Sequence, residues 1–506
     1  MSRTRTIWLL IAIVALAVAL RSYYITLRSV WFDESFTWRL IQFPVADLIA
    51  RTAADVHPPL YYILVKSWAV VFGSSALALR SFSVLCAALS IVGAYVFTSE
   101  AFRSKRAGII AAAFLAVSPW VIAYAGEARM YTLGMTFALF SSFALIRGIR
   151  AQSFRWFAVY GVLAAAFFYV HYYALFTIAA QALAVLIILL WQTKGRVGEI
   201  IQDRSLWAAL CGGMLALILV APWVPRFLAQ RSQVQEAYWI PRLTILSVPD
   251  TLYRVFVPTS TLPDRSGLMA IVLVLPLVLT ILIWLLLGFW RKSDTRDGSY
   301  LTLVLALVPF MLGIGISLGS RSLYNDRFFA FAGIFIFIAL AALVDRISYS
   351  RFRTGAVAIV LIFSIWAHAR SWNELDIAHS PGVHGAMQYI AHHRGIDDKI
   401  LVSSPYIYFP AAHYMKEEFQ ADQAVRLYSA DGKLSHFSGA PIAVASDVAS
   451  AQDISEYREA VWVVDTTGFT EQPFAAPANW HELSKEVFPE VFVHQGDIVV
   501  RQMRVL

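Results

Sequence analysis

The sequence predicts a polytopic α-helical membrane protein with a small α/β domain at its C-terminal end. Three observations support this prediction. Of 506 residues, 59% are hydrophobic and only 15% are charged, which is far more apolar than a soluble globular protein. The apolar residues occur in segments of roughly 20 residues, the length of a membrane-spanning helix. After residue 371, the composition changes to short segments that are typical of strands.

About eleven apolar segments are long enough to cross a membrane. We expect these helices at 7–24, 79–101, 107–124, 131–147, 156–171, 173–191, 207–225, 267–290, 300–318, 328–345 and 354–370. No small-x-small cleavage pattern follows the first segment, so we interpret it as an uncleaved membrane helix and not as a signal peptide. The run 156–191 is divided at His171, because a single helix of that length would be too long for a bilayer.

Basic residues predict the orientation of these helices. If the N-terminus is cytoplasmic, every cytoplasmic connection carries three basic residues, as the positive-inside rule requires. These residues are Arg103, Lys105 and Arg106; Arg147, Arg150 and Arg155; Lys194, Arg196 and Arg204; Arg291, Lys292 and Arg296; and Arg346, Arg351 and Arg353. The formal net charge of +8 is thus an orientation signal, and we expect no nucleic-acid partner. Cys86 and Cys211 lie in apolar segments, so no disulfide framework is predicted.

This orientation places three segments on the extracytoplasmic side of the membrane. They are 25–78, 226–266 and the residues after 371. We therefore predict a transmembrane domain at 1–370, with the first outer loop as its functional loop, and an extracytoplasmic α/β domain at 371–506. In the second domain we expect one helix and several strands. The helix is predicted at 382–395, and the strands at 399–404, 441–446, 460–465, 490–495 and 497–505.

Five groups of polar residues are expected on the outer side of the membrane, the first two in the first outer loop and the other three at the outer ends of apolar segments. They are Asp33 and Glu34 in "WFDESFTW", His57 in "DVHPPLYY", Glu127, Arg129 and Tyr131 in "YAGEARMY", His171 in "HYYALF", and Tyr324, Asp326 and Arg327 in "LYNDRFF". Ionisable groups near a membrane are costly and tend to line functional cavities. Their position on one side favours a site that opens outward, because a conduit would need polar groups through the whole bilayer.

Each group also has a purely structural interpretation. The alternatives are a solvated pair or helix cap for Asp33 and Glu34, a hydrogen-bonded bystander for His57, a mutual ion pair for Glu127 and Arg129, an aromatic-belt position for His171 and a snorkelling anchor for Arg327. Taken singly, each alternative is as good as the functional interpretation or better. The coincidence of all groups at one depth favours function.

The order of "WFDES", "HPPLYY", "ALRSFS", "SPWVIAYAGEARMY", "HYYALF" and "YNDRFF" resembles the bacterial branch of the protein O-mannosyltransferase superfamily. This superfamily, also called glycosyltransferase family 39-like, includes aminoarabinose transferases. The resemblance covers roughly residues 1–370, and "HPPLYY" and "EARMY" are its most specific motifs. It implies the C-type glycosyltransferase fold, a bacterial inner-membrane location and transfer of a sugar from a polyprenyl-phosphate donor to a hydroxyl acceptor. The sequence has no Gly-rich phosphate loop, which agrees with a lipid-linked donor.

The resemblance also implies roles for individual residues. Asp33 would be the general base that takes the proton of the acceptor hydroxyl in an inverting transfer, with Glu34 positioning the acceptor or Asp33 itself. The leaving phosphate needs cationic or hydrogen-bonding partners in a site of low dielectric constant. Candidates for this role are Arg129, Arg327, Tyr131 and Tyr324.

The sequence leaves open whether the protein uses a divalent metal ion. His57 stands where relatives have His or Lys before the Pro-Pro-Leu run, so the resemblance implies that it faces the donor phosphate or a metal ion. His57, Glu127 and His171 are candidate ligands, since imidazole and carboxylate suit zinc or manganese. The sequence lacks an ordered ligand pattern that would decide between metal-dependent and metal-free chemistry.

The sequence also leaves open the identity of the acceptor, and it leaves two alternative classes of protein to consider. The segment 226–266 is too short for the β-trefoil domain of eukaryotic protein mannosyltransferases, so glycan, lipid and protein hydroxyls are all candidate acceptors. One alternative is a lipid-linked saccharide transporter or flippase, which would show paired half-repeats and charges near the membrane midplane. Another is an O-antigen ligase or polymerase, which usually relies on a large late outer loop. The sequence shows neither of these transporter features, and the early acid pair of Asp33 and Glu34 argues against the ligase or polymerase.

Overall fold

The chain forms two compact units in a computed structural model. The model describes residues 2–233, 240–257, 278–281, 283, 295–319, 321–421, 425–434, 438–469, 474–492 and 495–506. The first unit comprises Met1–Tyr23, His57–Tyr61 and Ser83–Ala369. The second unit comprises Tyr24–Val56, Tyr62–Phe82 and Arg370–Leu506. Most of the segment predicted as the first outer loop therefore belongs to the same unit as the C-terminal α/β domain.

The first unit consists of long apolar helices. Within the described part of the chain, eight helices are long and apolar enough to cross a membrane, and a bent pair raises this number to nine. The long helices are α1 (Arg3–Tyr24), α5 (Ala76–Ala101), α8 (Tyr131–Ala151), α10 (Ala174–Gln192), α12 (Arg204–Val220) continued by η1 (Ala221–Trp223) and α13 (Val224–Gln233), α17 (Arg296–Gly319), α18 (Ala330–Asp345) preceded by η3 (Asp326–Phe329), and α19 (Ser350–Leu375). The predicted polytopic helical fold is thus confirmed.

The remaining helices of this unit are shorter. They are the bent pair α6 (Lys105–Val117) and α7 (Pro119–Ala125), α9 (Phe154–Val170), α11 (Val197–Gln202) and α14 (Ser247–Phe256). The predicted helix at 156–171 corresponds to α9, which is short for a span, and the division at His171 is observed. The predicted helix at 267–290 lies largely outside the described residues.

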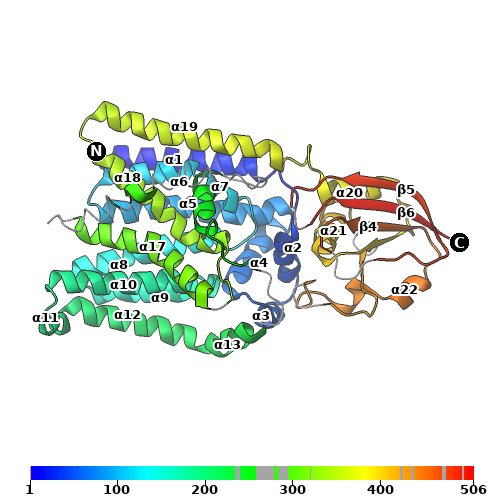
Figure 1. Cartoon of the computed structure of the whole chain (residues 1–506), viewed down its shortest axis with the longest axis horizontal. Helices are drawn as coiled ribbons and strands as arrows, with labels where there is room; N and C mark the ends of the chain where they lie inside the picture. The colour runs from blue at the N-terminus through cyan, green and yellow to red at the C-terminus, as the bar shows by residue number, and fades with distance from the viewer. Residues whose placement is uncertain are drawn as a thin grey trace. The chain divides into compact units, whose positions relative to one another are not determined.

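Small residues let the helices approach closely. Figure 1 shows α8, α9, α10 and α12 side by side, and α9 packs against both α8 and α12. A Cβ atom added to Gly161 would lie 2.3 Å from the carbonyl oxygen of Gly212. Backbone-to-backbone contact of this kind is typical of membrane helices, where van der Waals packing holds helices together.

The bend between α6 and α7 is stabilised by a buried arginine. The two helices meet at 55° on either side of Ser118, whose side chain caps α7. A bend frees carbonyl groups in the last turn of the first helix. The Arg21 guanidinium, fully buried on α1, donates hydrogen bonds to the carbonyls of Leu115 at 3.0 Å and Ala116 at 2.8 Å. The bend directs the chain into the loop that carries Glu127 and Arg129.

The second unit contains a six-stranded mixed sheet in the order β3-β2-β1-β4-β6-β5. The strands are β1 (Lys399–Val402), β2 (Val425–Tyr428), β3 (Val448–Ala449), β4 (Val461–Thr466), β5 (Trp480–Phe488) and β6 (Ile498–Val505). The first four strands are parallel to one another, and β6 pairs antiparallel with both β4 and β5. In the register of the sheet centre, Ile400 lies between Val425 and Trp462.

Helices from both ends of the sequence accompany this sheet. They are α2 (Phe32–Ile41), α3 (Val45–Ala54), most of α4 (Leu60–Phe72), α20 (Gly382–His393), α21 (Pro405–Glu417), η6 (Ala445–Asp447) and α22 (Ala451–Ser455). Helix α2 packs against α21, and α21 packs in turn against α20 and the strands β1 and β2. The helix that carries the acid pair is therefore attached directly to the α/β domain.

The strand predictions are partly correct. The predicted α/β composition, the helix α20 and the strands β1 and β4 are confirmed. The predicted strand at 441–446 is wrong, because this segment forms turns and leads into η6, and only the short β3 follows it. Of the predicted partner strand at 490–495, residues 493–494 lie outside the described residues, and the described residues 490–492 and 495 are not part of a strand. Strand β6 pairs instead with the earlier segment Trp480–Phe488.

Candidate active site

The acid pair lies in the first turn of α2, where carboxylates interact favourably with the helix dipole. Glu34 is buried, with 3% of its side chain exposed, and forms a two-pronged ion pair with Arg80. Arg80 Nε and Nη2 each lie 2.8 Å from one carboxylate oxygen of Glu34. The geometry is that of a planar guanidinium matched to a carboxylate, the strongest form of this contact.

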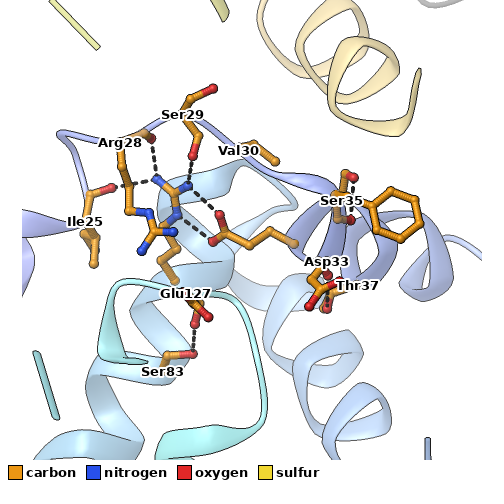
Figure 2. A network of polar contacts seen from close by, with 12 residues as sticks. Ile25, Arg28, Ser29, Val30, Asp33, Ser35, Thr37, Ser83 and Glu127 are labelled. Carbon is orange, nitrogen blue, oxygen red and sulfur yellow. Dashed lines mark hydrogen bonds and ion pairs between the residues drawn. The ribbon is translucent and has the colours of Figure 1, made fainter. Parts of the chain in front are cut away.

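Arg80 also holds the chain that precedes α2. Its guanidinium donates hydrogen bonds to the backbone carbonyls of Ile25, Arg28 and Ser29, each at 2.9 Å (Figure 2). A single buried cation thus neutralises Glu34 and closes the turn that leads into the acid pair. Sequence reasoning did not single out Arg80, although it lies in the quoted motif "ALRSFS".

Asp33 has a different environment from its neighbour. It is half-buried, and Figure 2 shows its side chain beside Thr37, one helical turn later. The Thr37 hydroxyl donates to the backbone carbonyl of Asp33 at 3.3 Å. The Glu34 carboxylate is therefore held in a buried ion pair with Arg80, whereas Asp33 is the more solvent-accessible carboxylate of the pair.

The first unit brings His57 and Arg129 together. Arg129 Nη2 donates to Nε2 of His57 at 3.2 Å, and only 3% of Arg129 is exposed. Because a guanidinium can only donate, Nε2 of His57 accepts and the ring proton resides on Nδ1. The neighbouring Glu127 is anchored through its backbone carbonyl, which accepts the Ser83 hydroxyl at 2.6 Å (Figure 2).

His171 lies buried among aromatic rings next to this pair. Its ring centroid is 6.1 Å from that of Tyr131 and 5.5 Å from that of Phe331. The Tyr173 backbone N–H donates to Nδ1 at 3.1 Å, so the proton of the neutral ring is on Nε2. Burial lowers the pKa of His171 well below 6.5, and the charges of His57, Arg129 and Arg327 lower it further. His171 is therefore neutral at physiological pH.

The motif "LYNDRFF" supplies a second cation to the same unit. Arg327 is the second residue of the short helix η3 (Asp326–Phe329), where the Asn325 side chain accepts its backbone N–H. Its guanidinium carbon lies 6.0 Å from the centroid of the Phe328 ring, and that centroid is 5.5 Å from the centroid of the His171 ring. Tyr324 is buried, and its ring packs at a tilt against Phe329 with ring centroids 4.7 Å apart. Burial is the main cause of a raised pKa of Tyr324, so its hydroxyl stays protonated.

Asp326 lies near an arginine that the sequence did not single out. Arg254 on α14 is 3.7 Å from the Asp326 carboxylate and hydrogen-bonded to Asp250 at 2.8 Å. The sequence around Arg254 gives no specific functional signal. An acid and a base four positions apart on a helix, such as Asp250 and Arg254, are common on protein surfaces. The described part of the first unit thus unites His57, Arg129, His171 and Arg327 around aromatic rings.

The candidate metal ligands are not gathered into one group in the described part of the chain. Among the described residues, no group of three or more His, Cys, Asp or Glu side chains is arranged to hold a metal ion. His57, Glu127 and His171 are all described, so this statement includes them. His57 instead contacts Arg129, a cation that would repel a metal ion at the same place.

The fold over almost the whole chain is that of the C-type membrane glycosyltransferases. The crystal structure of ArnT from Cupriavidus metallidurans bound to undecaprenyl phosphate matches with a TM-score of 0.62 and 12% identity, covering 99% of this chain and 98% of that one. The apo structure of the same protein matches with a TM-score of 0.60 and 13% identity over the same shares of both chains. The apo oligosaccharyltransferase from Archaeoglobus fulgidus has a TM-score of 0.52 and 12% identity, covering 92% and 70%.

The sequence comparison points to the same superfamily. Residues 56–225 match the family described as dolichyl-phosphate-mannose-protein mannosyltransferase. The match includes His57, Arg80, Arg129 and His171 but neither the acid pair nor Arg327. No curated protein matches the sequence. The predicted resemblance to the protein O-mannosyltransferase and aminoarabinose transferase superfamily, with its C-type fold, is thereby confirmed.

Proposed function

We propose that this multi-pass membrane protein is a glycosyltransferase that moves a sugar from a polyprenyl-phosphate donor to a hydroxyl acceptor. The observation that carries the proposal is a pair of cations, the buried Arg129 and the half-buried Arg327, near neutral His171, in a fold shared with a protein that was crystallised with undecaprenyl phosphate. A fixed positive charge in a site of low dielectric constant favours a phosphate much more strongly than the same charge in water.

Asp33 is the general base in this proposal. Its carboxylate takes the proton of the acceptor hydroxyl while that oxygen attacks the anomeric carbon from the face opposite the phosphate. The bond between the anomeric carbon and the phosphate oxygen breaks, and the polyprenyl phosphate leaves with the electron pair. Because the leaving group needs no proton, a single carboxylate is enough. Asp33 suits this task better than Glu34, whose carboxylate is occupied by Arg80.

The other predicted residues support the donor phosphate. Arg129 and Arg327 stabilise its developing charge, and the hydroxyls of Tyr131 and Tyr324 are candidate hydrogen-bond donors. His57 orients Arg129 through its 3.2 Å contact. We place the reaction on the outer face of a bacterial inner membrane, with a cytoplasmic N-terminus and an extracytoplasmic α/β domain, following the distribution of basic residues in the sequence. Glycan, lipid and protein hydroxyls are equally suitable acceptors in this mechanism.

Mass spectrometry of cells with and without the chain tests the function. We expect the deletion to remove one sugar from a surface glycan, lipid or protein and to accumulate the corresponding polyprenyl-phosphate sugar. Asp33→Asn should fail to restore the modification, whereas Asp47→Asn, the same change at an exposed aspartate of α3, should restore it. Full restoration by Asp33→Asn would refute the assignment of the base. Unchanged products in the deletion would favour a transporter.

Binding of undecaprenyl phosphate tests the phosphate site separately. Loss of a charge-assisted hydrogen bond costs about 1.5–3 kcal/mol. Arg327→Ala should therefore weaken binding roughly 10-fold to 100-fold, at 1.4 kcal/mol per tenfold. Arg321→Ala removes an exposed arginine from the same connection and is the matched control. Equal affinities of the two variants would exclude Arg327 from the phosphate site.

A further inference from the structure

Helix α2 begins without a cap of its own. The residue before it, Trp31, has extended backbone angles, and its side chain makes no capping hydrogen bond. The first amides of a helix have no partner inside the helix and need an acceptor elsewhere. Gln495 supplies one, because its Oε1 accepts the backbone N–H of Phe32 at 2.9 Å across 463 positions of sequence.

A second side chain of the α/β domain holds the chain just before α2. The hydroxyl of Tyr414, on α21, accepts the backbone N–H of Val30 at 2.7 Å. The same hydroxyl lies 3.3 Å from the Ser29 hydroxyl. Tyr414 is 2% exposed, and burial raises its pKa to about 12, so it remains a neutral phenol that can accept one hydrogen bond and donate another.

The orientation of the Gln495 amide is fixed by its two partners. Its Nε2 donates to the carboxylate of Glu490 at 3.3 Å, and its Oε1 accepts from Phe32. A flipped amide would place NH₂ against the N–H of Phe32 and an oxygen against the carboxylate, which is unfavourable at both ends. With only 2% of Gln495 exposed, water cannot substitute for either bond.

Aromatic contacts hold Phe32, the first residue of α2, and Trp31 just before it. The Trp31 ring stacks on Phe492 with centroids 5.5 Å apart, and the Phe32 ring packs on Tyr406 at 4.8 Å. These contacts set the location of the α2 N-terminus, and the hydrogen bonds of Gln495 and Tyr414 set the direction of its backbone. Asp33 follows Phe32 directly, so any shift of this N-terminus displaces its carboxylate.

We propose that Gln495 and Tyr414 are positioning residues for Asp33, and that the C-terminal α/β domain is thus a working part of the transferase centre. This inference rests on the proposed function, in which Asp33 is the base. A misplacement of a catalytic group by about 1 Å can reduce a rate 100-fold. Loss of either contact should therefore reduce the rate of transfer while leaving donor binding unchanged, since neither residue belongs to the proposed phosphate site.

The test uses the full chain with Gln495→Ala, Tyr414→Phe and, as a control, Tyr457→Phe, which makes the same change elsewhere in the domain, where Tyr457 stacks on Trp480. The donor is the polyprenyl-phosphate sugar extracted from cells that lack the chain. We expect a kcat at least tenfold lower in the first two variants, an unchanged KM for the donor, and tenfold faster hydrogen exchange at the amides of Phe32 or Val30. Tyr457→Phe should change none of these quantities.

A charge exchange separates positioning from general destabilisation. The single change Q495E places two carboxylates side by side and should lower kcat. The double change E490Q/Q495E restores one amide opposite one carboxylate, with an oxygen still facing Phe32, and loses the bond that Glu490 Oε2 accepts from the Val383 N–H. It should therefore recover part of the kcat that Q495E loses. A double variant as slow as Q495E would overturn the proposed pairing.

The remaining outcomes distinguish the two proposals. Parental kcat in both Gln495→Ala and Tyr414→Phe, with Asp33→Asn inactive, would refute the positioning role and leave the proposed function intact. Parental transfer by Asp33→Asn would refute the base and, with it, the positioning proposal. Unchanged exchange at Phe32 in Gln495→Ala would show that this side chain does not hold the helix.

Discussion

Removing the Arg80 side chain should open the segment that carries the acid pair. Arg80→Ala leaves the Glu34 carboxylate, 3% exposed, without its cation and three backbone carbonyls without their donor. Breaking a buried ion pair costs about 3–5 kcal/mol. We take the lower value, about 3 kcal/mol, because water can enter the space that the long side chain leaves and hydrate part of the site.

Native-state hydrogen exchange measures this effect locally. At 1.4 kcal/mol per tenfold, a loss of about 3 kcal/mol corresponds to roughly 100-fold faster exchange of the amides in residues 25–37, where opening occurs by local unfolding. The control is Arg196→Ala, which breaks an ion pair with Glu199 whose side chains are 66% and 50% exposed. Exposed pairs contribute at most about 1 kcal/mol, so exchange around α11 should change little. A change below threefold in residues 25–37 would refute the reasoning.

Three further predictions concern other parts of the molecule. Burial raises the pKa of Glu490 from 4.5 to about 7 although Arg28 and nearby N–H groups lower it, so its contribution to stability is complete at low pH and is lost as the pH rises through 7. In the parent, the free energy of unfolding should therefore fall by about 1–2 kcal/mol above about pH 5, the range expected for a half-buried group. Glu490→Gln should abolish this fall. His171 has the opposite sign, because its lowered pKa makes the parent lose stability as the pH falls below 6.5, and His171→Phe should remove that loss in thermal unfolding curves. Gly298→Ala should reduce the amount of folded protein in membranes, since the new Cβ atom would lie 2.0 Å from the Ala101 carbonyl oxygen, whereas Gly315→Ala enters open space.

Each of these predictions has a clear contrary result. Parallel pH curves for the parent and Glu490→Gln would mean that folding does not shift the pKa of this carboxyl group. A steeper acid loss in His171→Phe than in the parent would mean that His171 is protonated in the fold. Equal yields of the two glycine variants would mean that α5 and α17 can separate without cost.

The membrane spans were predictable because hydropathy alone determines them. A helix that faces lipid must be apolar along its length, and the sequence shows this directly. The strand β4 was predictable for a similar reason, since Val461–Thr466 is buried at the centre of its sheet. The edge strand β5 was missed because most of Trp480–Phe488 is exposed and rich in charged residues, a pattern that protects sheet edges but hides the strand.

The setting of the acid pair was not predictable from local patterns. Nothing near "WFDESFTW" shows that Glu34 pairs with Arg80, 46 positions later, while Asp33 does not take part in that pair. The predicted strand at 441–446 failed in the same way, because its alternating residues lie in turns between Gly439, with a positive φ of 84°, and η6. In both cases tertiary contacts outweigh the local preference.

The contact between Phe32 and Gln495 also sets when the centre can be completed during synthesis. At about 5–20 residues per second, the 463 positions between them take roughly 20 to 90 s to translate. During that time α2 has been made but its capping partner has not. The N-terminus of α2 can gain this contact only after nearly the whole chain has been made, so an unfinished chain would carry Arg129 and Arg327, the proposed donor-binding cations, before the proposed base is held in place.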